Sequence, residues 1–132
     1  MDLMVSTVTK EVQVDEILSL RTKVAKWAMD LVDALEADYN KKYPNSFKDM
    51  KFRVLEGRKY LKINQYDVDM DGKEFGGGVH AFIDKNTGEV YKPASWKSPA
   101  KHVRYDMRII NQREYVLNPQ NCGWSGGYLY MR

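Results

Sequence analysis

The chain has 132 residues, 43% of them apolar and 30% charged, with a formal net charge of +3, a composition typical of one ordered globular domain. The single cysteine, Cys122, excludes an internal disulfide framework and a cysteine-based zinc cluster, and it indicates a reducing compartment. No apolar run approaches the roughly 20 residues of a membrane span, and the first residues lack the pattern of a signal peptide, so we expect a cytoplasmic protein.

The first predicted element is a long helix over residues 15–42, preceded by a lead-in over residues 1–13. Apolar side chains recur at spacings of three and four across residues 17–35, which is the period of one helix face. Trp27 lies on this apolar stripe and is expected in the core. Pro44 disfavours helical backbone at the residue before it, so the helix must end there.

Residues 51–132 are expected to hold the sheet and the C-terminal elements, because the apolar period changes from helical to alternating after the helix. One hairpin is predicted around Gly57, and a second around the DKNTG turn that ends at Gly88. We interpret the polar, glycine-rich stretch 67–78 as a connection between strands. The alternation at residues 128–130 suggests a closing strand.

This order of elements predicts a single domain over residues 1–132 of the α+β class. One long N-terminal helix would pack on an antiparallel β-meander of three to five strands, which is a stable two-layer arrangement. The other face of the sheet would remain available to solvent or to a partner. Pro93 and Pro99 deny hydrogen bonds to a sheet, so the segment between them is expected to form an ordered loop or a short helical turn.

The most distinctive feature of the sequence is a basic, aromatic segment from Lys92 to Arg108, which carries five Lys or Arg residues and one acid. Lys and Arg neutralise phosphates, while Trp and Tyr offer flat faces on which unpaired bases stack. Basic residues of the first hairpin, with Tyr60 among them, could share the same sheet face. Structurally, the same pattern also fits Trp96 filling the core with lysine stems at its edge. The predicted nucleic-acid-binding residues are Arg58, Lys59, Lys92, Trp96, Lys97, Lys101, Arg104, Tyr105 and Arg108.

The sharpest local motif is acidic and opens like a calcium-binding loop. Asp67, Asp69 and Asp71 occupy the first, third and fifth positions, and a glycine follows. The twelfth position holds Gly78 where such a loop needs a glutamate. The three carboxylates are therefore weak candidates for a cation site, and no metal or other cofactor is predicted.

The two histidines, His80 and His102, lie outside any spacing that is typical of a metal or catalytic motif. No serine lies in a nucleophile-elbow context either. Catalytic triads are defined by space and not by sequence, so an enzyme stays open, but these residues favour a binding protein.

Three stretches carry a recognisable pattern: GRKYLKI at residues 57–63, VHAFIDKNTGEVYKPASWKSPAKHVRY at 79–105 and GGYLYMR at 126–132. In these stretches the chain resembles a group of small, mostly uncharacterised proteins of tailed bacteriophages, notably phages of marine bacteria. The KPASWKSPAK core is the most specific part, with two prolines, a tryptophan and three lysines. The resemblance covers most of the chain after Arg53 and implies a phage origin and the cytoplasm of the infected host cell. It implies no activity and no catalytic residue.

These observations leave three functions open. The first is a phage accessory protein that binds DNA or RNA through a basic, aromatic surface. The second is a phage protein that binds a host protein or assembles in the virion, and such a protein could form a homo-oligomer. The third binds a small phosphorylated ligand or nucleotide in a basic pocket. Trp96 distinguishes them best, because an exposed Trp96 would mark a binding surface and a buried one would belong to the core.

Overall fold

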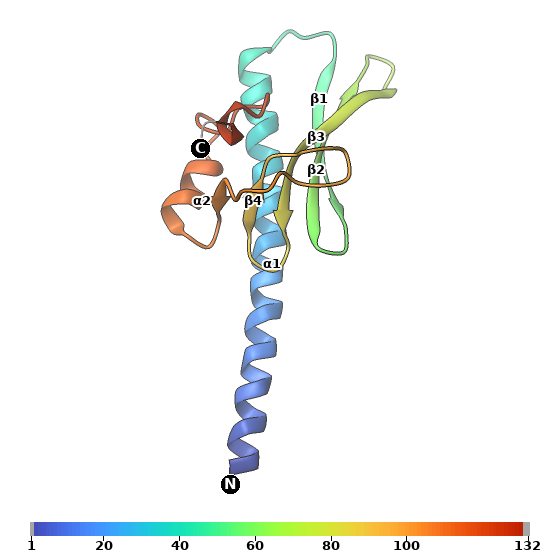
Figure 1. The fold of residues 1–132 in the computed structure, drawn as a ribbon. Helices are drawn as coiled ribbons and strands as arrows, with labels where there is room; N and C mark the ends of the chain where they lie inside the picture. Colours follow the sequence, from blue (N-terminus) through green and yellow to red (C-terminus); the bar gives the residue numbers. More distant parts are fainter. Residues whose placement is uncertain (1, 131–132) are drawn as a thin grey trace.

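The longest element of the protein is helix α1, which runs from Asp2 to Lys42 (Figure 1). The computed structural model describes residues 2–130 and, for residues 2–18, the backbone alone. The helix contains the whole predicted range 15–42 and also continues through residues 2–13, where we expected a separate lead-in. No glycine or proline occurs before Pro44, so nothing in the sequence interrupts the helix earlier. The N-terminal half of α1 extends beyond the other elements in Figure 1.

Five antiparallel strands follow α1 in the spatial order β1-β2-β3-β4-β5. Each strand pairs with the next one along the chain, which confirms the predicted α+β fold with one long helix and a meander. Gly88 has a φ of 82° in the turn between β3 and β4, as the turn prediction requires. The strands span Asp49–Glu56 (β1), Tyr60–Val68 (β2), Glu74–Asp84 (β3), Glu89–Tyr91 (β4) and Tyr105–Asp106 (β5).

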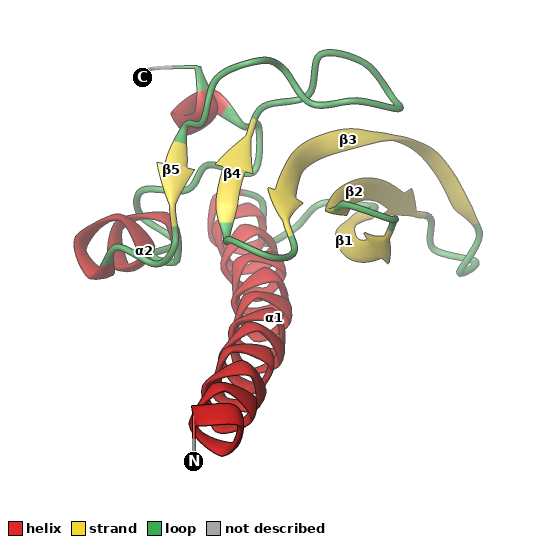
Figure 2. Cartoon of the chain, turned by 60° about the horizontal axis from the view of Figure 1, so that its bottom comes forward, coloured by secondary structure: helices red, strands yellow, loops and turns green. Residues whose placement is uncertain are grey.

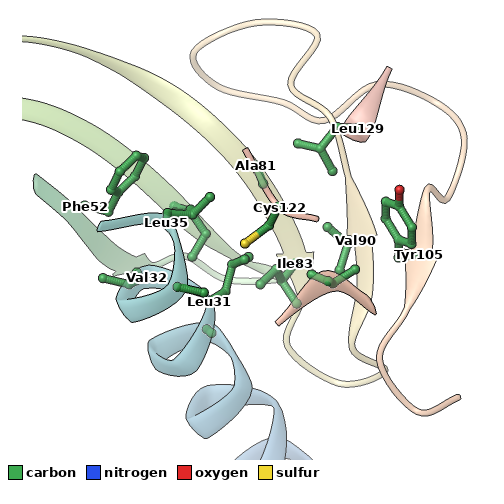
Figure 3. Close-up of a cluster of buried hydrophobic side chains, with 14 of the residues drawn as sticks. Leu31, Val32, Leu35, Phe52, Ala81, Ile83, Val90, Tyr105, Cys122 and Leu129 are labelled. Carbon is green, nitrogen blue, oxygen red and sulfur yellow. The ribbon is translucent and has the colours of Figure 1, made fainter. Parts of the chain in front are cut away.

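The hydrophobic core lies between α1 and one face of this sheet (Figures 2 and 3). Leu31 and Leu35 of α1 and Ile63 and Ile83 of the sheet are fully buried. Burying each such side chain stabilises the fold by about 1.5–3 kcal/mol relative to leaving it exposed. Trp27 is half-buried and packs against the same cluster, which agrees with its predicted place in the core.

Strand β2 ends at Val68 and β3 starts at Glu74, so the connection that we expected over residues 67–78 is wrong at both ends and covers only residues 69–73. Gly77 has a φ of 130°, and a Cβ there would lie 2.9 Å from the carbonyl oxygen of Gln65. Only glycine fits such a close approach between two paired strands. The pairing with β2 shifts register here, and β3 curves strongly in Figure 2.

After β5 the chain forms helix α2 (Ile110–Val116) and then a short 3₁₀ helix (Gly127–Leu129). The predicted closing strand at residues 128–130 is therefore wrong. The N–H of Leu129 donates to the carbonyl of Gly126 at 3.1 Å, a three-residue spacing that belongs to a 3₁₀ turn. Leu129 is fully buried, so this segment covers the core instead of extending the sheet.

Two polar contacts hold the C-terminal segment in place. The N–H of Trp124 donates to the Oδ2 atom of Asp38 on α1 at 3.0 Å. The Nε2 atom of His80 lies 2.8 Å from the hydroxyl oxygen of Tyr128. A register shift after Ile63 leaves His80 as the extra residue of a bulge in β3, and the bulge turns its ring toward the core. The segment after α2 is thereby tied to both layers of the fold.

Candidate nucleic-acid interface

The outer face of the sheet is the face turned away from α1, and a row of aromatic and basic side chains crosses it. Successive residues of a strand point to opposite faces, so Lys62 and Phe82 lie opposite the core residues Leu61 and Ile83. Lys62 pairs with Phe82, and Phe82 pairs with Tyr91 on β4. One row therefore spans β2, β3 and β4 on the face that α1 leaves uncovered.

The loop between β4 and β5 folds over this outer face. Pro93 and Pro99 form an isolated bridge, and the N–H of Ala100 donates to the carbonyl of Lys92 at 2.8 Å. The loop is thus ordered, as the two prolines predicted. In Figure 2 it reaches across above β3, on the side away from α1.

Trp96 lies in the middle of this loop, outside the core, and is 55% exposed. The ammonium nitrogen of Lys62 lies 4.7 Å from the centre of the Trp96 ring and 5.7 Å from that of Phe82. Cation–π contacts of this kind contribute about 0.5–1 kcal/mol at exposed sites. They hold the indole above the sheet, and the structure therefore places Trp96 on the surface.

Tyr60 completes the group around Lys62. Its ring lies 5.9 Å from the ring of Phe82 and 5.8 Å from that of Tyr91, both edge to face. Phe82 is only 2% exposed although it does not belong to the main core, because its neighbours on the outer face cover it. We name this group the outer-face cluster; its members are Tyr60, Lys62, Phe82, Tyr91 and Trp96.

A cavity of about 270 Å³ adjoins the cluster where β1 turns into β2. Four basic side chains line it: Arg58 and Lys59 from the turn, Lys62 from β2 and Lys97 from the loop. One acidic side chain, Glu56, also lines it, and its carboxylate lies 3.9 Å from the ammonium of Lys85. None of the four forms an ion pair with another residue in the described part of the chain. Like charges gathered in one concave site raise the local positive potential and attract an anion. We name this site the basic cavity.

A second cavity, of about 220 Å³, lies beside Trp96 and has no charged side chain in its lining. Trp96 borders this uncharged cavity, while its neighbour Lys97 and its contact Lys62 border the basic cavity. The two cavities share no lining residue and are linked by the contact between Lys62 and the Trp96 ring and by the chain bond from Trp96 to Lys97. The lining of the uncharged cavity is Val79, Pro93, Ala94, Ser95 and Trp96.

Four of the predicted binding residues, Arg58, Lys59, Trp96 and Lys97, thus meet at these two cavities. Three other predicted residues, Lys92, Lys101 and Arg104, line neither cavity. Lys92 places its ammonium 4.6 Å from the centre of the Tyr130 ring, and Lys101 is exposed. Arg104 is half-buried, and its N–H donates to the carbonyl of Val90.

The prediction that Tyr105 stacks on bases is wrong. Tyr105 is 3% exposed, and its hydroxyl donates to the carbonyl of Tyr128 at 2.9 Å. Strand β5 pairs with β4 and brings this ring into the core, where Figure 3 shows it beside Val90. The hydroxyl bond and the burial leave no ring face for a base.

Arg108 is exposed, but its charge is already matched. Its guanidinium Nη2 and Nε atoms donate to the carboxylate of Asp106 at 2.7 and 3.0 Å. These hydrogen bonds lower the pKa of Asp106, which therefore stays charged beside Arg108. A phosphate would have to compete with this carboxylate, so Arg108 is a poor phosphate contact.

The three carboxylates of the predicted loop do not converge. Asp67 is buried and forms an ion pair with Lys48 at 3.3 Å. The Oδ1 atom of Asp69 accepts the N–H groups of Asp71 and Lys73, both at 2.9 Å, and so stabilises the turn itself. Among residues 19–130, whose side chains the structure describes, no group of three or more His, Cys, Asp or Glu residues is placed to hold a metal ion.

The other residues with distinctive chemistry are buried in the core. Burial lowers the pKa of His80 to about 4 and raises the pKa of the Cys122 thiol to about 12. Both side chains are therefore neutral near pH 7 and fill structural positions. A larger cavity, of about 660 Å³, lies between the end of α1 and residues 118–120, but its buried carboxylate, Asp38, already bonds Trp124 and Lys42.

Of the outer-face cluster, only Trp96 was among the predicted binding residues, and Phe82 was not considered for the site at all. A usable signal was present, since Phe82 stands between Ala81 and Ile83, both of which face the core. A residue between two core positions on a strand must face the other way. Its pairing with Lys62 depends on register, however, and register across the glycine-rich stretch could not be derived from the sequence.

Comparison with known proteins gives one match. Residues 8–131 match the model of a family described as a family of unknown function, DUF7717. No curated protein and no solved structure matches the chain. Among the described residues, no helix is both long enough and apolar enough to cross a membrane.

Proposed function

We propose that this chain, which belongs to the DUF7717 family of unknown function, binds nucleic acid. The proposal is based on the outer face of its sheet. Lys and Arg side chains of the basic cavity contact phosphates, and Trp96 stacks on a base. The observation that carries this proposal is the Lys62–Trp96 contact at 4.7 Å, which joins an exposed indole to a cavity with four cations and one carboxylate in its lining. Cationic grooves with exposed aromatic rings are the usual means of binding single strands.

The charges of the outer face support the proposal. Arg53, Lys85 and Arg108 each have a carboxylate partner, whereas the four cations of the basic cavity have none in the described residues. A bound phosphate would relieve the mutual repulsion of these four and release counterions from the nucleic acid. We propose that the protein acts as a phage accessory protein in the cytoplasm of the infected host cell, as its sequence resemblance implies.

The test is a titration of labelled oligonucleotides followed by fluorescence anisotropy at roughly 50 and 200 mM salt. The affinity is expected to fall steeply between the two. Lys97→Gln should weaken binding of all sequences and reduce the slope of log K against log salt by about 1. Lys23→Gln, on an exposed position of α1, removes the same charge elsewhere and should change neither. An absence of binding at low salt would refute the proposal.

A second candidate function, binding of a host or virion protein, is favoured by a different observation. Ile109, Ile110 and Tyr115 are exposed at and beside α2. Exposed apolar side chains that are close together often mark protein contacts. Size-exclusion chromatography with light scattering tests this candidate. A stable oligomer that persists after nuclease treatment would favour it, and a monomer that binds oligonucleotides would count against it.

A further inference from the structure

The basic cavity and the uncharged cavity are linked through Lys62 and Trp96, and their different linings match the two parts of a nucleotide, its phosphate and its base. The basic cavity has four cations, while the uncharged cavity has Val79, Pro93 and the indole among its lining residues. We infer that this surface selects unpaired nucleotides, with a base in the uncharged cavity against Trp96 and an adjoining phosphate in the basic cavity. This inference rests on the proposed function and names the form of nucleic acid that it takes.

The uncharged cavity suits the flat face of a base. Lys62 lies over the Trp96 ring at 4.7 Å, and the ring remains 55% exposed, so surface is left for a stacking partner. Base–aromatic stacking contributes about 1–3 kcal/mol per base and tolerates every base, because each base has a π-face. The adjacent ammonium of Lys62 would add a favourable contact with the electron-rich rim of that base.

The basic cavity suits the phosphate that is next along the same strand. Lys97 follows Trp96 directly in the chain, so the same short loop carries the stacking ring and this cation. The loop that holds both is closed by the Pro93–Pro99 bridge and by the bond between the N–H of Ala100 and the carbonyl of Lys92. The backbone that carries ring and charge is therefore ordered before the ligand arrives, which reduces the ordering cost of binding.

A duplex cannot use this arrangement. Both faces of a paired base are covered by its neighbours in the stack, so a duplex offers no free base face to the exposed Trp96 ring. A duplex would need to unstack and extrude a nucleotide, which costs a few kcal/mol. An intact duplex can therefore bind only by electrostatic attraction to the basic cavity, and this attraction weakens as the salt concentration rises.

The experiment compares three probes of equal length at one salt concentration: a single strand, its duplex, and a single strand whose sugars carry no bases. The single strand is expected to bind at least about tenfold more tightly than the other two, since stacking contributes about 1–3 kcal/mol. Trp96→Ala should reduce the affinity for the single strand to the level of the other probes. Trp96→Phe, which keeps a ring, should retain most of it, and thermal melting should show that both variants fold.

The outcomes separate the two proposals. If the duplex or the base-free strand binds as tightly as the single strand, and Lys97→Gln still weakens all three, the inference is overturned while nucleic-acid binding stands. If none of the probes binds at low salt, the proposed function itself fails. If a mononucleotide competes as well per molecule as the single strand does, the site takes a free nucleotide, and the inference about strands is also overturned.

Discussion

The two faces of the sheet are made of the same strands but are closed in different ways. On the core face, aliphatic side chains such as Ile63 and Ile83 are sealed by α1 and by the C-terminal segment. On the outer face, Phe82 is just as well buried, yet no helix covers it: the ring of Tyr60 and the ammonium of Lys62 contact it, and the Trp96 indole lies next to that ammonium. A cover made of side chains can open to a ligand, whereas a cover made of a helix cannot without unfolding.

This difference shows where stability and binding are expected to separate. Substitutions on the core face should change the free energy of unfolding and leave the chemistry of the surface intact. Substitutions on the outer face should do the reverse, because exposed cations contribute little to stability. The predictions that follow test this separation, beginning with the largest effect.

The largest effect is expected on the core face. Ile83→Ala removes buried methyl groups at a fully buried position and should reduce the free energy of unfolding by about 2–5 kcal/mol. Leu55→Ala, at an exposed position of β1, is the matched control and should cost well under about 1 kcal/mol. Urea denaturation followed by circular dichroism measures both. Equal losses in the two variants would mean that α1 does not seal the face as described.

The second effect concerns His80, which links the sheet to the C-terminal segment. Its pKa is about 4 in the folded protein against 6.5 ordinarily, so the unfolded chain binds a proton that the folded protein excludes. Stability is complete above about pH 6.5, falls as the pH drops toward 4, and loses nothing further from this group below pH 4. The total loss is about 3 kcal/mol.

Urea midpoints measured between pH 7 and pH 4 test this dependence. The control is His80→Gln, which can still bond the Tyr128 hydroxyl but does not titrate, so its midpoint should vary less over the same range. An identical pH dependence in the two proteins would rule out His80 as its source.

On the outer face, Lys62→Met keeps the stem that covers Phe82 and removes the charge. The free energy of unfolding should change by less than about 1 kcal/mol, while the salt dependence of oligonucleotide binding should lose about one phosphate contact. Lys23→Met provides the matched charge change on α1. A large loss of stability without a change in binding would show that Lys62 only supports the packing of Phe82.

The smallest effect is expected for Arg108, although it belongs to the same basic segment as Lys97. Because Asp106 already matches its charge, Arg108→Gln should alter oligonucleotide affinity by less than about twofold. Anisotropy titrations of Arg108→Gln and Lys97→Gln under one set of conditions give the comparison. A loss for Arg108→Gln as large as that for Lys97→Gln would show that the cavity does not define the site.

Much of the fold could be predicted from the sequence, because the signals were local. The helical stripe around Leu31, the stop at Pro44 and the turn at Gly88 each depend on residues close together in the chain. The candidate site was only half predictable, since Trp96 and Tyr105 belong to one basic segment but Trp96 is exposed and Tyr105 is buried. The two prolines keep Trp96 out of the sheet, whereas β5 returns Tyr105 to the core, and that return depends on pairing between distant residues.

The most direct test of the binding surface is to map a bound oligonucleotide on the protein by amide NMR of isotope-labelled protein. We predict that adding a short single strand shifts the signals of Lys62, Trp96 and Lys97, together with the Trp96 indole N–H. The signals of Ile83 and Leu129 in the core should stay in place. Shifts confined to the cavity at the end of α1 and residues 118–120, or no shifts at low salt, would contradict the account.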